Sequence, residues 1–424
     1  MYMGPSDASP IFRVSNFHLK AEAPESYRTV LHCDANSFFV SCEIARRPEY
    51  AGKPVAVCGS EADRHGIVLA KNDIAKGYRV KTAETVWQAR QKCPELVIVP
   101  PNYSLYAEMS EKMNDIFYEY TDRIEPFGVD ESWLDVSCSA KLFGNGREIA
   151  NRIRERIANE LGITVSIGVS FNKVFAKLGS DLKKPNAISV IPPESFASIV
   201  WPLPVTALLF VGRSTAFALE ELGVWTIGDL ACCDDVSLEE SLGKNGLMLK
   251  RFALGRDYAE VTPWKYSSEP KSVSNGMTFR YNLSTPEEVS FAVTYLSMSV
   301  AERLRRHSLC CKNVSVSVRT PDMKSFSRTV KLPHPSCLYS EISQAALALI
   351  KENTEPESEI YSVTVSAEKL TALNEFLFQQ QIFGSAWESK YKKRHSLETT
   401  VDSIRSRYGR ELIGIASQIN NRLI

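Results

Sequence analysis

The sequence predicts a multidomain protein of the α+β class, on three observations. Its 424 residues exceed the size of a typical single domain, so two to four domains are expected. An apolar fraction of 44% with 10% aromatic residues can fill several cores and argues against disorder. Strand-like and helix-like segments alternate up to about residue 195, and a second such alternation begins near residue 270.

The first alternating region supplies most of the regular structure. Strands are expected in TVLHCD, KPVAVCG, GIVLAKN, FGVDESWLDV and ITVSIGVS, which are rich in β-branched residues. Helices are expected near 82–94, 103–122 and 147–160.

Residues 196–265 have the pattern of short helices. Val211 and Gly212 stand directly before one helix, and Gly223 lies in the turn after it. Two helices joined by glycine turns resemble a helix-hairpin-helix element. The free amides at the N-terminus of such a helix can bind phosphate. Ordinary short helices with glycine caps are the alternative.

The charge is balanced overall and uneven locally. Fifty basic and 50 acidic side chains cancel, so no global field attracts nucleic acid. Between Lys271 and Lys331, however, ten basic residues accompany four acidic ones. This module suits phosphate contact, and a merely solvated basic face is the alternative.

Cysteine usage and hydropathy indicate the compartment. Ten cysteines form no C-x-x-C pair, which favours reduced thiols in a cytosolic protein. No run approaches the ~18 apolar residues of a membrane span, and the N-terminus lacks signal-peptide features. A protein without a membrane partner is expected, with residues 1–24 as an N-terminal extension.

Two adjacent acids interrupt the strand-like segment FGVDESWLDV. Alternation would place Asp130 and Glu131 on opposite faces of a regular strand unless the chain turns there. A hairpin tip with solvated acids is one interpretation. The other interpretation groups these two acids with Asp34, which ends an apolar strand. Carboxylates at two strand ends can hold two cations ~3.5–4 Å apart, the geometry that in-line displacement at phosphorus requires. Oxygen ligands without convergent His or Cys favour Mg²⁺.

Five segments occur in an order that carries a family resemblance: DANSFFVSCE, GKPVAVCG, AKNDIAKGYRVKT, FGVDESWLDVS and GVSFNKVFAKLGSDLKKPN. They resemble Y-family DNA polymerases, most closely the bacterial polymerase IV branch, over roughly residues 28–410. The resemblance implies a right-hand polymerase with a ferredoxin-like palm, small fingers, a helix-hairpin-helix thumb and an α/β little finger. The implied boundaries are 25–195 for palm and fingers (fingers about 45–100), 196–265 for the thumb, 270–372 for the little finger and 373–424 for a tail.

The resemblance assigns roles to matching residues. Asp34, Asp130 and Glu131 match the carboxylates that bind two Mg²⁺ ions. The carbonyl of Ala35 matches a backbone ligand. Phe39 matches the steric gate, whose rigid ring leaves a 2′-hydroxyl neither room nor a partner; a core Phe is the alternative.

Further nucleotide contacts are implied at Phe38, Lys76 and Lys184. Phe38 is expected beside the incoming nucleotide and the lysines on its triphosphate, with solvated lysines as the alternative. Asp73 replaces a Tyr found in many relatives, which leaves the contacts near it open. Lys177 is a weaker candidate, with support of the active-site wall as its alternative role.

DNA and clamp contacts are implied in the later domains. The DNA candidates are Val211, Gly212, Gly223, Arg280, Arg303, Arg305 and Lys312. Gln379, Ile382 and Phe383 resemble the peptide by which bacterial polymerases bind the sliding clamp, although Gln380 replaces the usual Leu. An ordinary linker with a buried Phe is the alternative.

These matches predict a template-directed DNA polymerase that adds dNMPs to a primer 3′-OH by a two-metal mechanism. The expected partners are primer–template DNA and dNTP, with the chain a monomer in the bacterial cytoplasm, associated with the nucleoid. The family implies error-prone translesion synthesis without proofreading. Two alternative functions are a nucleotidyl cyclase-like enzyme and a non-catalytic DNA-binding repair accessory protein. The first would lack the basic little finger, and the second would have lost the carboxylates.

Overall fold

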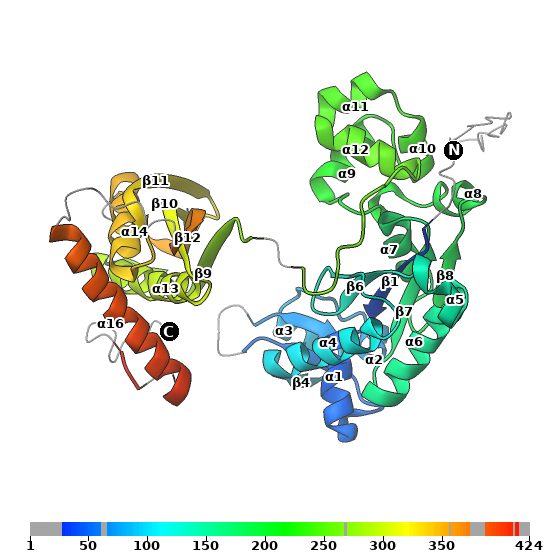
Figure 1. The fold of residues 1–424 in the computed structure, drawn as a ribbon, viewed down its shortest axis with the longest axis horizontal. Helices are drawn as coiled ribbons and strands as arrows, with labels where there is room; N and C mark the ends of the chain where they lie inside the picture. The colour runs from blue at the N-terminus through cyan, green and yellow to red at the C-terminus, as the bar shows by residue number, and fades with distance from the viewer. Residues whose placement is uncertain are drawn as a thin grey trace, which may run out of the picture. The chain divides into compact units, whose positions relative to one another are not determined.

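The computed structural model describes residues 28–60, 66–266, 269–355, 358–373, 386–409 and 412–414. The N-terminal extension and the predicted clamp residues Gln379, Ile382 and Phe383 lie outside the described residues. The chain forms two compact units, and the boundary between them follows Tyr266 (Figure 1).

The first unit is organised around a five-stranded sheet of order β5-β6-β1-β7-β8. Its strands are β1 (Val30–Ala35), β5 (Ile124–Pro126), β6 (Glu131–Asp135), β7 (Val165–Ser170) and β8 (Ile188–Ile191). The accompanying helices are α1 (Phe38–Arg46), α4 (Tyr103–Tyr118), α5 (Ala140–Phe143), α6 (Gly146–Leu161) and α7 (Lys173–Leu182). The central strand β1 pairs antiparallel with β6 and β7, and β7 pairs parallel with β8.

Side-chain alternation along β1 separates the two faces of this sheet. Leu31 and Cys33 join the core formed with α4 and α6. Val30 instead clusters with Ala176 of α7. His32 and Asp34 share the alternation of Val30, so both lie on the α7 face.

The close approach of α7 to the sheet depends on Gly168 in β7. A Cβ added there would lie 1.8 Å from the carbonyl oxygen of Ala176. A residue without a side chain therefore lets α7 pack directly on the strands, where it contacts both β7 and β1.

A three-stranded sheet of order β3-β2-β4 forms a smaller module. It contains β2 (Val55–Cys58), β3 (Val68–Lys71), β4 (Val97–Val99), α2 (Asp73–Gly77) and α3 (Val86–Lys92), and the 3-10 turn Pro48–Tyr50 precedes it. Asn72 ties the module together, because its side chain accepts hydrogen bonds from the N–H groups of Ala75 and Val55.

Short helices follow the five-stranded sheet. They are α8 (Phe196–Val200), α9 (Arg213–Glu221), α10 (Ile227–Cys232), α11 (Asp235–Leu242) and α12 (Lys244–Ala253) (Figure 1). Helix α9 starts after Gly212, and Gly223 follows it with φ 74°, a left-handed conformation that favours glycine. Helix α10 starts at a capping box of Thr226 and Asp229. These two helices and their glycine turn form the hairpin that the sequence predicts.

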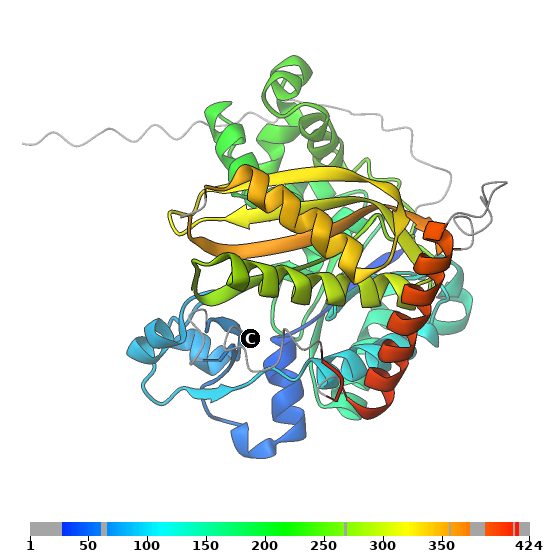
Figure 2. The ribbon, with the colours of Figure 1, turned by 90° about the vertical axis from the view of Figure 1, so that its left-hand side faces the viewer.

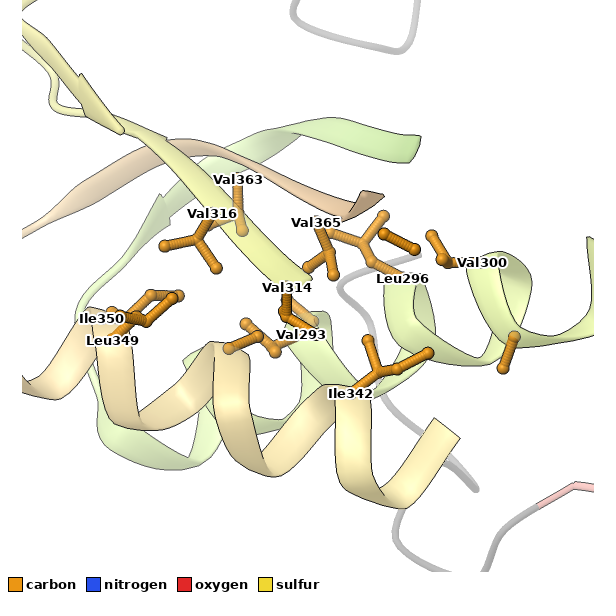
Figure 3. Packing of buried hydrophobic residues seen from close by; sticks show 14 of the residues in the cluster. Val293, Leu296, Val300, Val314, Val316, Ile342, Leu349, Ile350, Val363 and Val365 are labelled. Carbon is orange, nitrogen blue, oxygen red and sulfur yellow. The ribbon is translucent and has the colours of Figure 1, made fainter. Parts of the chain in front are cut away.

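The second unit is a four-stranded antiparallel sheet of order β11-β10-β12-β9, covered on one face by two helices that lie side by side (Figure 2). Its elements are β9 (Ser272–Leu283), α13 (Pro286–Arg306), β10 (Leu309–Arg319), β11 (Ser325–Ser336), α14 (Tyr339–Asn353), β12 (Ile360–Ala372) and α16 (Ala386–Tyr408). Apolar side chains of α13, α14, β10 and β12 interdigitate between the layers (Figure 3).

The predicted α+β class is confirmed by these mixed layers. The helix expected at 103–122 ends earlier, at Tyr118. Among the described residues, no helix has the length and apolarity needed to span a bilayer.

Candidate active site

The end of β1 brings the predicted carboxylates together. Asp34 lies directly opposite Glu131 in the antiparallel pairing of β1 with β6. Residues 127–130 form a bend, and β6 begins only at Glu131. The carbonyl of Asp130 accepts a hydrogen bond of 2.9 Å from the N–H of Ala35. The chain therefore turns at the adjacent acids, which resolves the conflict with strand alternation.

The three carboxylates interact electrostatically. Burial, followed by the negative charges of Asp34 and Glu131, raises the pKa of Asp130. The side chains of Asp34 and Glu131 are only 16% and 18% exposed. Acids gathered in such a site oppose one another's ionisation unless cations compensate them.

Two lysines supply that compensation. Lys184 Nζ lies 2.8 Å from Asp34 Oδ2 and 2.7 Å from Asp181 Oδ1. Burial acts to lower the pKa of Lys184, but Asp181 and Asp34 outweigh burial and raise it. Lys177 of α7 forms an ion pair with Glu131 Oε2. Both lysines singled out in the segment GVSFNKVFAKLGSDLKKPN thus lie at the carboxylates.

Glu131 is held in its ionised form. Burial acts to raise its pKa, but the contacts with His32 and Lys177 outweigh burial and lower the pKa to about 2. His32 is fully buried, and its Nε2 lies 3.2 Å from Glu131 Oε2. Burial lowers the pKa of His32, so the ring is neutral near neutral pH.

The donor set fits a hard divalent cation. Carboxylate oxygens of Asp34, Asp130 and Glu131, with the peptide oxygen of Ala35, are the ligand type that Mg²⁺ prefers. Across the described ranges, no three acidic, His or Cys side chains form a ready-made metal cage. Ammonium groups pair with Asp34 and Glu131 instead. A cation bound at Asp34 would compete with the ammonium group of Lys184 for this carboxylate.

The predicted gate residue has a rigid backing. The ring of Phe39 stacks on Tyr106, with centroids 4.2 Å apart and planes inclined by 11°, and meets Tyr103 edge-on at 6.2 Å. Tyr106 Oη donates a hydrogen bond of 2.9 Å to the buried carboxylate of Glu43. Phe38, in contrast, is 3% exposed and belongs to the sheet core, which leaves it little surface for a nucleotide.

The three-stranded module carries the other predicted triphosphate ligand, Lys76. Lys76 and Asp73 are both exposed on α2. Burial and then the charge of Lys76 lower the pKa of Lys71, whose Nζ donates to Thr82 Oγ1 at 2.9 Å. Lys71 and Lys76 are therefore near enough to repel one another electrostatically.

The second unit presents an open sheet face of small polar residues. Val314, Val316 and Val318 of β10 point into the core, so the intervening residues lie on the opposite face. The strand registers align two rows across this face: Thr329, Ser315, Ser366 and Ser274, and then Ser327, Ser317, Thr364 and Gly276. These two rows present hydroxyl groups or no side chain, and the next rows of the same face carry Lys331 and Glu368 at one end and Arg319 at the other.

The predicted DNA contacts of this unit divide into two groups. Arg280, Arg303 and Lys312 are exposed, and Arg303 donates to the Ser274 carbonyl at 2.7 Å. Arg305 has only 7% side-chain exposure. Its guanidinium donates to both Asp402 oxygens at 2.7 and 3.1 Å. It also donates to Glu398 and to the Cys337 carbonyl. Arg305 therefore anchors α16 and is not presented to DNA.

The predicted thumb contacts lie at the helical hairpin. Gly212 is the exposed residue before α9, Val211 is half-buried beside it, and Gly223 is exposed in the turn. Two large aromatic side chains, Phe217 and Trp225, are 63% and 61% exposed in the same region.

Comparisons with known proteins agree with this geometry. The chain matches the impB/mucB/samB family over residues 33–181 and the C-terminal domain of that family over residues 270–381. A solved Y-family DNA polymerase chimera of Dbh and Dpo4 superposes with a TM-score of 0.71 at 25% identity, covering 81% of this chain and 99% of that one. The DNA polymerase IV of Acetivibrio thermocellus is 46% identical over 382 residues, which cover 90% of this chain and 95% of the relative.

The chain belongs to the Y family of DNA polymerases. The DNA polymerase IV 1 of Bacillus subtilis, another relative, is 39% identical over 74% of this chain and 75% of its own length. The predicted Y-family resemblance, its polymerase IV branch and the right-hand polymerase fold are confirmed.

Several residues around the Y-family carboxylates were missed in the sequence. These are His32 and Ser180 behind Glu131, and Tyr106 and Glu43 behind Phe39. The available signal for His32 was its position two residues before Asp34, on the same strand face. No local pattern links Tyr106 to Phe39.

Proposed function

We propose that the chain is a template-directed DNA polymerase that adds dNMPs to a primer 3′-OH during translesion synthesis. The observation that carries this proposal is the convergence of Asp34, Asp130 and Glu131 at the end of β1. Lys177 and Lys184 contact these carboxylates, and the proposed site also includes the ring of Phe39, which stacks on Tyr106. The name DNA polymerase IV, carried by a relative that is 46% identical, supports the same activity.

The carboxylates would hold two Mg²⁺ ions, which lower the pKa of the primer hydroxyl and neutralise charge on the phosphates. Asp130 ionises reluctantly beside Asp34 and Glu131, so the site gains electrostatically when positive charge arrives. Lys177 holds Glu131 in its ionised form throughout.

Lysines bind the triphosphate in this proposal. The Lys184 ammonium leaves Asp34 and takes a phosphate oxygen, because a flexible point charge can exchange one anion for another. Lys76 contributes from the small module, with Lys71 beside it. The exposed Asp73 repels phosphate, so no contact is assigned to it.

Phe39 excludes ribonucleotides. Its ring is fixed by stacking on Tyr106, which the Glu43 hydrogen bond holds in turn. A ring that cannot retreat leaves no space for a 2′-hydroxyl.

Low fidelity and the absence of proofreading complete the proposed activity. The three-stranded module has strands of only three or four residues, a small cover for a nascent base pair. The sequence has no further acid-rich segment that resembles an exonuclease.

DNA is bound by phosphate contacts rather than by base reading. Gly212, Gly223 and the neighbouring Val211 would contact it in the thumb. The second unit would meet it with the open sheet face and with the exposed side chains of Arg280, Arg303 and Lys312; the buried Arg305 is not among these contacts. We keep the clamp peptide with Gln379, Ile382 and Phe383, a monomeric state and nucleoid association as parts of the proposal.

Primer extension tests the proposal. The double variant Asp130→Asn, Glu131→Gln keeps the side-chain shapes and removes two negative charges. We expect wild type to extend a primer with Mg²⁺ and dNTPs, and the double variant to bind the same DNA without extending it. Extension by the double variant at the wild-type rate would overturn the proposal.

A further inference from the structure

His32 occupies a position that the proposed chemistry does not use. It lies in β1 opposite Trp133 of β6 and Gly168 of β7, with its ring centroid 5.3 Å from that of Trp133. The side chain is 0% exposed. Burying an imidazole costs folding free energy unless its nitrogen atoms have hydrogen-bond partners, so both nitrogens of His32 are expected to have one.

One nitrogen has a clear partner. His32 Nδ1 lies 2.9 Å from Ser180 Oγ, and that hydroxyl can donate its single proton either to Nδ1 or to the Lys177 carbonyl 2.7 Å away. Nε2 is different: it is buried and makes no aligned hydrogen bond to any described residue, although Glu131 Oε2 is only 3.2 Å away.

The neighbourhood of Nε2 decides which nitrogen carries the proton. In the Nδ1–H tautomer, the Nε2 lone pair would face a carboxylate oxygen, and the two would repel. In the Nε2–H tautomer, the Ser180 hydroxyl rotates from the Lys177 carbonyl to donate to Nδ1, and Nε2–H faces Glu131 Oε2. The 3.2 Å between Nε2 and Oε2 is within reach of this bond.

The two oxygens of Glu131 have different surroundings. Oε2 contacts Lys177 and His32. Oε1 lies 3.7 Å, and Asp130 Oδ1 lies 3.3 Å, from the position that a Cβ on Gly128 would take. Oε1 therefore lies near Gly128 of the bend, as does Asp130 Oδ1.

We propose that His32 is a positioning residue whose Nε2–H donates to Glu131 Oε2 and, with Lys177, turns Oε1 toward the metal side shared with Asp130. This inference rests on the proposed role of Glu131 as a metal ligand. It assigns His32 a role in metal affinity rather than in the chemical step.

Two substitutions separate this role from simple packing. His32→Gln places an amide N–H near the position of Nε2, whereas the shorter His32→Asn reaches only toward Ser180. The readout is the dissociation constant of Mn²⁺, measured by electron paramagnetic resonance on the full chain with dideoxy-terminated primer–template and dNTP. Loss of a group that orients a ligand typically weakens metal binding about 10–100-fold.

We expect His32→Asn to weaken Mn²⁺ binding by at least about tenfold and His32→Gln to stay within about threefold of wild type. Equal weakening by both variants, or by neither, would overturn the inference. Glu131→Gln is the reference: if it retains wild-type Mn²⁺ affinity, the role of Glu131 fails. If only the His32 variants behave like wild type, the His32 inference alone fails.

A measurement on the unmodified chain tests the same inference even if the variants do not fold. ¹⁵N NMR of histidine-labelled protein reports the tautomer of each of the six histidines. We expect His32 to carry its proton on Nε2, and a neutral ring protonated on Nδ1 would sink the inference.

Discussion

Replacing Gly168 with alanine tests whether the contact between β7 and α7 positions the carboxylate site. The added Cβ would lie 1.8 Å from the Ala176 carbonyl oxygen and 2.5 Å from Ser180 N, whereas real Cβ contacts essentially never fall under 3.0 Å. Helix α7 must move away, because backbone atoms cannot rotate aside as a flexible side chain can. Overpacking costs about 1–3 kcal/mol or more, and the reduced freedom of the unfolded chain offsets roughly 0.4–1 kcal/mol of this.

We expect a net loss of about 2 kcal/mol, or roughly 4–8 °C in the melting temperature of a unit of this size, measured by scanning calorimetry. Gly77→Ala is the matched control, because its added Cβ meets no atom within 4 Å and its melting temperature should stay level or rise slightly. Mn²⁺ affinity should also fall in Gly168→Ala, since Lys177 and Ser180 move with α7. A Gly168→Ala protein that melts like wild type would refute the close contact.

Three further outcomes are expected. Phe39→Ala should incorporate ribonucleotides in primer extension, and continued exclusion would contradict the gate. Arg303→Gln should weaken DNA binding and lower the slope of the logarithm of the binding constant against the logarithm of salt concentration by about one. Arg305→Met should leave that slope unchanged and make the amides of α16 exchange faster with solvent hydrogen. The reverse pattern would contradict the assigned roles. The pKa of Glu131 is about 2 in the folded chain against an ordinary 4.5, so its contribution to stability is fully present above about 4.5 and is lost as pH falls through about 2. His32 and Lys177 lower this pKa together, so Lys177→Met should remove part of this stability at neutral pH and little in strong acid. Urea unfolding that shows a pH-independent difference would contradict this.

The turn at the adjacent acids could be predicted because strand alternation is a local rule. In one regular strand, either Asp130 or Glu131 would face the apolar interior. The structure instead has a bend at residues 127–130, which precedes the strand. Almost a hundred residues separate Asp34 from this bend, and the sequence joined them by two signals: the place of Asp34 at the end of an apolar strand, and the family resemblance. The pairing of Asp34 with Glu131 is a property of the sheet register.

Residues behind the carboxylates could not be predicted, because their roles come from long-range packing. Ser180 reaches His32 only because α7 crosses β7 at Gly168. Tyr106 backs Phe39 only because α4 packs beside α1.

Arg305 shows a different reason for a missed role. Its place in a basic segment predicts a surface cation, since composition counts charges without giving their direction. On α13 its side chain turns to α16, where Glu398 and Asp402 neutralise it. A helix almost a hundred residues away in the sequence therefore determines the ion-pair partners of this arginine.

Anomalous diffraction from Mn²⁺ offers the most direct view of the carboxylate site. Crystals of the full chain with dideoxy-terminated primer–template and dNTP would be measured at the manganese absorption edge. We predict two peaks, both bounded by oxygens of Asp34, Asp130 and Glu131, with Lys184 moved from Asp34 to the triphosphate. A bound dNTP with no manganese peak between these three side chains would contradict the proposed polymerase site.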